Sequence, residues 1–227
     1  MINDFFDLFF PPLCNHCEGL LTQKKDALCV ACYLNLPFTH HYEAETTETF
    51  NRFSGRMPLE HAASLLYFHK KGMAQNLIHQ LKYKGNQNIG SYLGNLTVEQ
   101  YKNQPILQNF DEIVMVPLHP KRLKKRGYNQ VETFAKTIAE ATQKPINNLI
   151  LYKKIHTETQ TKKALSNRTS IDKDTFQIED AEANIGKHFL LLDDVMTSGT
   201  TLETCGKALL QIPKTKISIF TMAYTHF

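Results

Sequence analysis

The stretch at residues 190–202 constrains the fold of this chain more than any other. It reads Leu-Leu-Leu-Asp-Asp-Val-Met-Thr-Ser-Gly-Thr-Thr-Leu and directly follows Phe189. An uninterrupted apolar run of this kind is typical of a buried parallel strand. Beyond the loop, apolar residues recur at spacings of three and four, which predicts a helix over residues 200–211. A strand, two acids, a loop of small residues and a helix start therefore follow one another.

This order suits a phosphorylated sugar. Small hydroxyl residues and a glycine let the backbone approach a phosphate, whose charge meets free N–H groups and the positive end of the helix dipole. The carboxylates of Asp193 and Asp194 can accept hydrogen bonds from sugar hydroxyls. The alternative is an ordinary strand, loop and helix with a capping hydroxyl and two solvated acids. The complete order of features favours the sugar-phosphate interpretation.

The same residues resemble the phosphoribosyl pyrophosphate (PRPP) motif of type I phosphoribosyltransferases. In that family the two acids hold the ribose hydroxyls and the loop amides wrap the 5-phosphate. The resemblance implies that Asp193 and Asp194 are the ribose ligands. It also implies a phosphate loop formed by Thr197, Ser198, Gly199, Thr200 and Thr201. The glycine and lysine order of an ATP-binding P-loop is absent, and so is Gly-x-Gly-x-x-Gly.

Length and composition indicate an ordinary globular protein. The chain has 227 residues, with 42% hydrophobic and 21% charged residues, enough for one good-sized domain and a small appendage. The net charge of +4 is too small to indicate nucleic-acid binding by itself. The apolar start carries acids and no basic region, so it does not read as a signal peptide. No run approaches the ~20 apolar residues of a membrane span, and we expect a soluble, cytoplasmic protein without a membrane partner.

Four cysteines in two close pairs predict a metal site. Cys14, Cys17, Cys29 and Cys32 form C-x2-C-x11-C-x2-C, and four thiolates are a tetrahedral set for one structural Zn²⁺. A redox dithiol is the alternative, which two pairs this close make less favourable. The fifth cysteine, Cys205, falls on the apolar stripe of the last helix and is expected in the core.

Two regions follow from these patterns. Residues 1–60 are expected to be a zinc-binding segment with a linker, because residues 39–50 are polar and aperiodic, with His40 and His41 at the surface. Residues 61–227 alternate strands and helices, which predicts an α/β fold with a parallel, doubly wound sheet covered by helices on both faces. The expected strands are 62–69, 113–116, 149–152, 189–192 and 217–222; the expected helices are 73–83, 89–101, 128–142 and 200–211. Ligands of such sheets bind at the carboxyl ends of the strands.

A basic loop follows the strand at 113–116. It places five cations within six residues: Lys121, Arg122, Lys124, Lys125 and Arg126. Facing the phosphate loop, this cluster could neutralise a pyrophosphate; it could also bind a nucleic-acid backbone. The alternative is a solvated helix start, where cations oppose the helix dipole unless an anion is bound.

Two further places carry cations. Lys82 stands at the end of the first helix of the main region, where it suits either phosphate binding or the helix C-terminus. Residues 153–175 are polar and without core periodicity, and a segment this long is typical of a lid. Its Arg168 is a further candidate for phosphate binding.

Several motifs together resemble the ComF family, which includes competence protein ComFC and its GntX relatives. They are the cysteine pairs, Leu-Lys-Tyr-Lys-Gly at 81–85, Pro-Leu-His-Pro at 117–120, Arg-Gly-Tyr-Asn-Gln at 126–130, residues 160–168 and the PRPP motif. The resemblance covers nearly the whole chain. It implies a cytoplasmic bacterial protein of natural transformation that handles single-stranded DNA beside a ComFA-like helicase. Many relatives carry further cysteine pairs, which residues 33–60 lack, leaving a single zinc.

Two functions remain open at this stage. The first is a PRPP-binding competence factor whose basic loop and Tyr128 contact single-stranded DNA. The second is an active phosphoribosyltransferase of nucleotide metabolism, with an unidentified nitrogen acceptor and no DNA role. In that enzyme Mg²⁺ would accompany PRPP, Asp193 and Asp194 would position the ribose, and Arg126 with its neighbouring cations would stabilise the leaving pyrophosphate.

Overall fold

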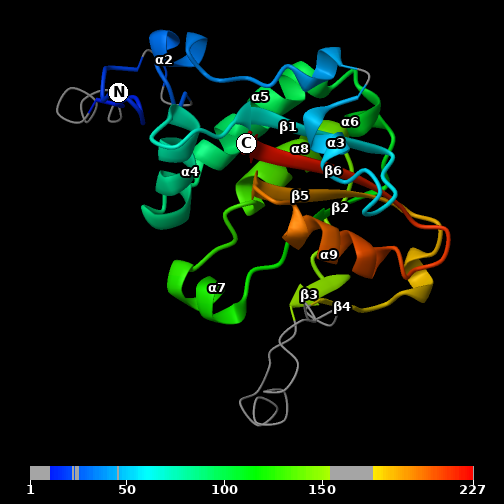
Figure 1. Cartoon of the computed structure of the whole chain (residues 1–227). Coiled ribbons are helices and arrows are strands. Elements are labelled where there is room, and N and C mark those ends of the chain that lie inside the picture. Colours follow the sequence, from blue (N-terminus) through cyan, green and yellow to red (C-terminus); the bar gives the residue numbers. More distant parts are fainter. Residues whose placement is uncertain (1–10, 22, 24–25, 45, 154–175, 227) are drawn as a thin grey trace, which may run out of the picture.

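A parallel sheet forms the centre of the molecule (Figure 1). The computed structural model describes residues 11–21, 23, 26–44, 46–153 and 176–226. Within them, four strands pair in the order β1-β6-β5-β2, all parallel. Their bounds are β1 His61–Tyr67, β2 Glu112–Met115, β5 His188–Met196 and β6 Lys216–Tyr224. The predicted α/β class with a parallel sheet is confirmed.

Both faces of the sheet are apolar, which explains the continuous apolar run of β5. Successive residues of a strand point to opposite faces. Leu190 and Leu192 belong to one core cluster, whereas Phe189 and Leu191 belong to the other. A strand buried on both sides cannot show the alternating pattern of a half-exposed strand.

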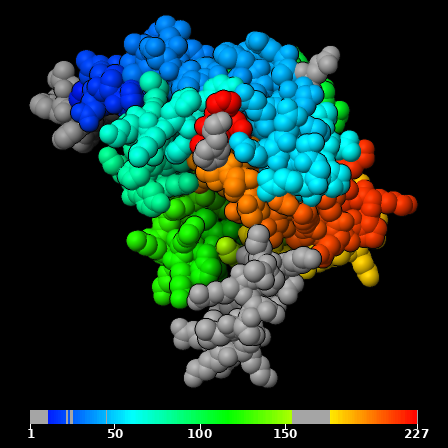
Figure 2. All heavy atoms as spheres, in the orientation of Figure 1, coloured from blue at the N-terminus to red at the C-terminus, as the bar shows by residue number. Residues whose placement is uncertain are grey.

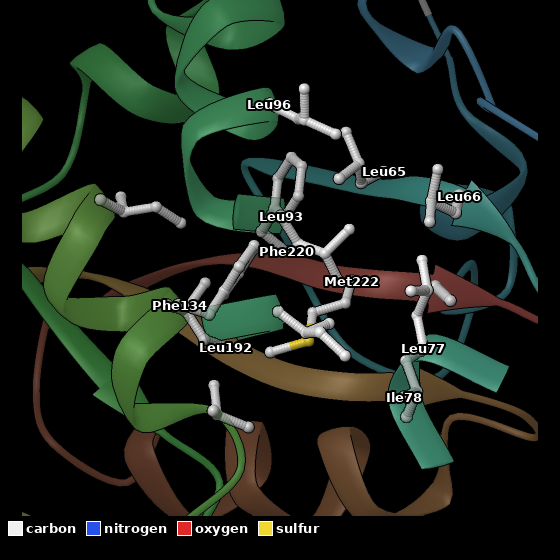
Figure 3. Close-up of a cluster of buried hydrophobic side chains, with 14 of the residues drawn as sticks. Leu65, Leu66, Leu77, Ile78, Leu93, Leu96, Phe134, Leu192, Phe220 and Met222 are labelled. Carbon is white, nitrogen blue, oxygen red and sulfur yellow. The ribbon is translucent and has the colours of Figure 1, made fainter. Parts of the chain in front are cut away.

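Helices cover each face. On one face lie α4 Met73–Tyr83, α5 Asn88–Tyr101, α6 Pro105–Gln108 and α8 Glu132–Thr142. Figure 3 shows Leu77, Leu93 and Phe134 converging with Phe220 and Met222 in this core. On the other face lies α9 Thr200–Leu209. The two-sided helix cover is therefore as predicted.

The remaining elements are short. They are α2 Val30–Leu34, η1 His41–Glu43, α3 Glu48–Asn51, α7 Pro120–Arg126 and η3 Glu182–Asn184, with β3 Leu151–Lys153 and β4 Phe176–Ile178 in a separate antiparallel pair. The predicted short strand is present one to two residues later, and its partner β4 was not predicted. Among the described residues, the helices are all too short or too polar to cross a membrane.

The expected linker at residues 39–50 is instead part of the packed structure. His41, Thr47 and Thr49 are buried, and the surface position expected for His41 is wrong. The Thr49 hydroxyl lies 2.8 Å from that of Ser64, which lies 2.7 Å from that of Thr221. Polar side chains are tolerated in the interior when they hydrogen-bond one another, so composition alone misassigned this segment.

The chain connections create a crevice at the carboxyl edge. After β2 the chain passes through α7 and then enters α8, which lies on the face that carries α4 and α5. It leaves the neighbouring strand β5 for α9, on the opposite face. Where helices depart to opposite sides of adjacent parallel strands, the ends of those strands are left uncovered and ligands bind there. The two acids of β5 lie at this end.

Close packing of α5 on α8 gives a test of the fold. A Cβ built on Gly90 would lie 2.1 Å from the Thr133 hydroxyl. We expect Gly90→Ala to destabilise the protein by about 1–3 kcal/mol because that contact is overpacked. In a Thr133→Ala background, where the hydroxyl is absent, the same change should be neutral or stabilising, since alanine favours a helix. Urea unfolding of the four proteins measures both effects; an equal cost in both backgrounds would contradict the assigned contact.

Candidate functional site

The two acids of β5 lie within the strand rather than after it. We predicted that the strand ends at Leu192, but pairing with β6 extends it to Met196, which lies opposite Tyr224. Because strand residues alternate, Asp193 and Asp194 point to different faces of the sheet. Asp193 lines a small hollow together with the loop at residues 197–201. Asp194 faces α4 on the other side, where it contacts Lys82.

The small-residue loop, residues 197–201, turns directly into α9. Gly199 is the N-cap residue and has φ +77°, a left-handed conformation that glycine adopts without steric cost. A Cβ at this position would also come within 3.1 Å of the Phe53 ring. The hydroxyls of Ser198 and Thr200 lie 3.0 Å apart. The loop thus combines hydroxyl side chains and the start of a ten-residue helix around one hollow.

Asp194 forms a partly buried ion pair. Its Oδ1 accepts a hydrogen bond from Lys82 Nζ at 2.8 Å, and the carboxylate side chain is 7% exposed. Its Oδ2 is buried and has no hydrogen-bond partner among the described residues. Such an unsatisfied acceptor is costly, and a ligand hydroxyl is the kind of donor that would relieve it.

Asp193 carries a strongly shifted pKa. Burial, followed by the neighbouring Asp194 carboxylate, raises the pKa of Asp193 to about 8, against the lowering effects of the Asp194 backbone N–H and of Lys82. Two carboxylates this close share a single cation, so ionising both is unfavourable. Burial and the neighbouring carboxylate therefore both favour the protonated form of Asp193.

A cationic cavity adjoins this pair. It has a volume of about 430 Å³ and is lined by Lys82, Tyr83, Gly85, Arg122, Lys125, Arg126 and Tyr128. None of these lining residues is acidic. Lys82 lines the cavity and also holds Asp194, so the cavity and the acid pair meet at one side chain. An anionic group would be stabilised here by charge alone.

The basic loop is in fact a helix, α7. His119 caps it by accepting a hydrogen bond from the Lys121 backbone N–H at 3.1 Å, and Pro120 at its first turn is favourable. Its last turn carries Lys124, Lys125 and Arg126. Cations at a helix C-terminus are stabilised by the dipole, so the unfavourable helix start of the alternative interpretation does not apply to these three. Lys121 and Arg122 do lie in the first turn of α7.

Residues 126–130 hold α7 in place. The Arg126 guanidinium lies over the Tyr83 ring at 5.4 Å and donates a hydrogen bond to Gln130. The Tyr128 hydroxyl donates to the Leu81 carbonyl at the end of α4. Asn129 donates to the Val116 carbonyl at 3.2 Å. This stretch therefore ties the end of α4 to the end of β2 and forms one wall of the cavity.

The structure unites most of the predicted anion-binding residues. Asp193 lies with Thr197, Ser198, Gly199, Thr200 and Thr201, and Lys82 lies with Arg122 and Arg126. Lys121 and Lys124 are exposed on α7 and are not among the residues that line the cavity. Arg168, with most of the expected lid, lies outside the described residues.

Sequence reasoning missed one group that touches the loop. Arg56 donates to the Ser198 carbonyl at 2.9 Å, and Phe53 packs against Gly199. Both lie just after the predicted linker at residues 39–50, and Arg56 precedes Ser198 by 142 residues. Nothing in their local spacing indicated this contact.

The four N-terminal cysteines lie together. The Sγ atoms of Cys14, Cys17, Cys29 and Cys32 are all within 4.8 Å of one another, and those of Cys17 and Cys29 are 3.6 Å apart. Zn–S bonds of about 2.3 Å in a tetrahedron place sulfurs roughly 3.8 Å apart. The cluster therefore fits a metal ion held by four thiolates. Cys205 is buried in the core, as predicted.

Comparison with known proteins identifies the relatives of this chain. It is 25% identical over 224 residues to competence protein F of Haemophilus influenzae, covering 95% of this chain and 98% of that protein. It is 24% identical over 213 residues to competence protein ComFC of Bacillus subtilis, covering 92% and 83%. The chain is therefore a homologue of proteins named competence protein F and competence protein ComFC. The DNA utilization protein YhgH of Escherichia coli is 27% identical over 152 residues, 66% of each chain. The similarity to competence protein F therefore extends along nearly the whole of both chains, whereas the similarity to YhgH is partial.

Comparisons with family models and with solved structures give no closer assignment. No protein-family model matches the chain. Among solved structures, the adenine phosphoribosyltransferase of Leishmania tarentolae has a TM-score of 0.40 and 12% identity, covering 71% of this chain and 91% of that one. The description of the fold therefore rests on the strand order and helix layers of this chain itself.

The Lys82–Asp194 pair gives a stability prediction. Lys82→Met should lower the free energy of unfolding at neutral pH by about 1–3 kcal/mol, because it leaves a buried carboxylate without its cation. The loss should shrink in an Asp194→Asn background. Lys84→Met, at an exposed neighbouring site, is the control and should cost little. Guanidinium unfolding measures all four variants, and an equal loss for Lys82 and Lys84 would argue against the pair.

The cysteine cluster gives a second prediction. Purified protein should contain about one equivalent of zinc, as four thiolates bind one ion. Chelation, or Cys14→Ser with Cys32→Ser, should remove the metal and lower the melting temperature, since metal binding supplies folding free energy to such a segment. Cys205→Ala should keep the full equivalent. Elemental analysis with thermal melts tests this, and a metal-free chain with an unchanged melting temperature would contradict it.

Proposed function

We propose that this chain binds PRPP and serves the uptake or handling of DNA in natural transformation. The observation that carries the first part is the Lys82–Asp194 contact of 2.8 Å. It joins the cationic cavity to the acid pair, and the small-residue loop lies beside Asp193 of that pair. The loop suits a phosphate, the acid pair accepts hydrogen bonds from hydroxyls, and the cavity suits a second anion. Together these groups match the chemistry of a ribose that carries a phosphate and a pyrophosphate.

Each part of the ligand has a partner in this arrangement. The 5-phosphate would occupy the hollow at Thr197, Ser198, Gly199, Thr200 and Thr201, where backbone N–H groups and the α9 dipole favour an anion. The ribose hydroxyls would meet Asp193 and Asp194, whose unsatisfied Oδ2 supports such a contact. The pyrophosphate would lie among Lys82, Arg122, Lys125 and Arg126.

A magnesium ion fits the same place. The carboxylates and the phosphates of the ligand are oxygen donors, which Mg²⁺ prefers. When bound, the ion would supply charge compensation for the pyrophosphate. The chain itself supplies the cations of the cavity and the hydrogen-bond acceptors on β5. For the cysteine cluster we propose zinc, because four thiolates are its usual structural set.

The relatives support the second part of the proposal. Two of them are named as competence proteins and a third as a DNA utilization protein. The exposed cations of α7 suit the phosphate backbone of single-stranded DNA. A ComFA-like helicase is the protein partner that we propose on the same grounds. Lys121 and Lys124, which lie outside the cavity lining, would then serve DNA rather than PRPP.

A second candidate is an active phosphoribosyltransferase. It is favoured by the cations of the cavity, which lie where a leaving pyrophosphate needs compensation. The C1–O bond to pyrophosphate would break, a C1–N bond to an acceptor would form, and the acceptor nitrogen would lose a proton. Release of pyrophosphate in the presence of nitrogenous bases or amines would support this candidate over a binding role alone.

Calorimetry with PRPP and Mg²⁺ tests the binding proposal. Wild-type protein should bind, and Asp193→Asn with Asp194→Asn should weaken binding at least about tenfold, because two ligand acceptors are lost. Binding of single-stranded DNA should persist in that variant. An equal loss of DNA binding in the folded variant would refute separate sites, and absence of PRPP binding to the wild type would refute the proposal.

Two lysines of α7 provide a matched comparison. Lys125 lines the cavity and Lys124 does not, although both are exposed and adjacent. Lys125→Glu should weaken PRPP binding more than Lys124→Glu does, because only the first reverses a charge beside the pyrophosphate. Both should weaken DNA binding. Equal effects on PRPP would contradict the assigned cavity.

A further inference from the structure

Arg56 contacts the small-residue loop from outside the sheet region. Its Nη1 donates to the Ser198 carbonyl at 2.9 Å and to the Arg52 carbonyl at 3.1 Å. Its Nε donates to Glu203 at 2.9 Å, and its Nη2 donates to the same carboxylate oxygen. In Figure 2 the residues around 50, in light blue, lie directly against those around 200, in orange. One side chain therefore joins the loop, the first turn of α9 and the N-terminal segment.

Glu203 is an unusual neighbour for an anion site. It lies in the first turn of α9, where its negative charge would compete with a phosphate for the positive end of the helix. Its side chain is 18% exposed, so water screens it only in part. The pKa of Glu203 is lowered by Lys207 and by Arg56, against the effect of burial. The carboxylate is thus kept ionised, and its charge is balanced by two cations.

The two cations differ in position. Lys207 lies one turn further along α9 and is 54% exposed, whereas Arg56 is 30% exposed. Arg56 also engages the Ser198 carbonyl, an oxygen whose partial negative charge would otherwise face solvent beside the hollow. Phe53, three residues earlier, packs on Gly199 and fixes the loop from the same side. Arg56 is therefore placed to set both the charge and the shape of the loop.

We propose that Arg56 is a positioning residue for the phosphate site: it neutralises Glu203 and holds the Ser198 carbonyl, so that the loop accepts a phosphate monoester. The proposal rests on the proposed binding of PRPP, whose 5-phosphate is that monoester. It assigns Arg56 to one half of the ligand, the 5-phosphate, and gives it no role toward the pyrophosphate, which the cavity at Lys82 and Arg126 would take.

The experiment compares three probes by calorimetry: PRPP with Mg²⁺, ribose 5-phosphate and inorganic pyrophosphate. Arg56→Gln should lower the affinity for PRPP and for ribose 5-phosphate by the same factor, about tenfold or more, because a partly buried carboxylate is left uncompensated. Its affinity for pyrophosphate should be unchanged. A general loss of structure would lower the affinity for all three probes alike. An equal loss for the three probes would therefore overturn the proposal.

A second substitution distinguishes the effect of the Glu203 charge from an effect on the shape of the loop. Glu203→Gln in the Arg56→Gln background should restore most of the affinity for ribose 5-phosphate, since the repelling charge is gone. Lys207→Gln, which removes the more exposed partner of the same carboxylate, is the control and should change affinity less than about threefold. If Arg56→Gln fails to fold, Arg56→Lys, which keeps the charge, is measured with the same probes and should retain ribose 5-phosphate binding while losing part of the affinity.

The outcomes are distinguishable. Wild-type protein that binds none of the three probes would reject the proposed function itself. Wild-type protein that binds PRPP, together with Arg56→Gln that binds ribose 5-phosphate equally well, would reject only the role of Arg56. Failure of Glu203→Gln to rescue a weakened Arg56→Gln would reject the neutralisation of Glu203.

Discussion

The burial of β5 on both faces and along both edges is the constraint on which the rest depends. Its neighbours β2 and β6 supply its backbone partners, and helices on either side cover its apolar side chains. This enclosure removes water from the two acids near the end of β5, which disfavours their charged forms. The pleat directs the two side chains to opposite faces, so each carboxyl group has different neighbours. Asp194 is compensated by Lys82, whereas burial raises the pKa of Asp193 and favours its uncharged form.

Features encoded in short stretches were predictable. The apolar run of β5, the bounds of α4 at 73–83 and the cysteine cluster each follow from neighbouring residues, whose period or spacing has one main structural meaning. The extension of β5 to Met196 was not predictable in this way, because pairing with Tyr224 of β6 decides it. The burial of Thr49 was missed for the same reason. Its hydroxyl pairs with that of Ser64, which in turn pairs with that of Thr221, and a local pattern contains neither partner.

In the candidate site, too, the parts encoded by neighbouring residues were predictable and the parts that depend on distant contacts were not. Its loop and its acids could be named from the sequence, since their residue types and order are specific. The basic cluster was recognised by composition, but its helical form and the exclusion of Lys124 from the cavity lining depend on how Tyr128 and Asn129 tie α7 to α4 and β2. Arg56 was missed entirely, because its partners Ser198 and Glu203 lie far away in the chain.

That separation has a consequence for how the molecule is built. The contact between Arg56 and Glu203 spans 147 residues, so it cannot form until most of the chain has left the ribosome. Contacts of such long range are formed late, because a large loop must close before they add any stability. Domains otherwise tend to fold from the N-terminus during synthesis. Because Arg56 and Phe53 contact the loop at residues 197–201 from the N-terminal part of the chain, we expect this loop to reach its final shape late in folding.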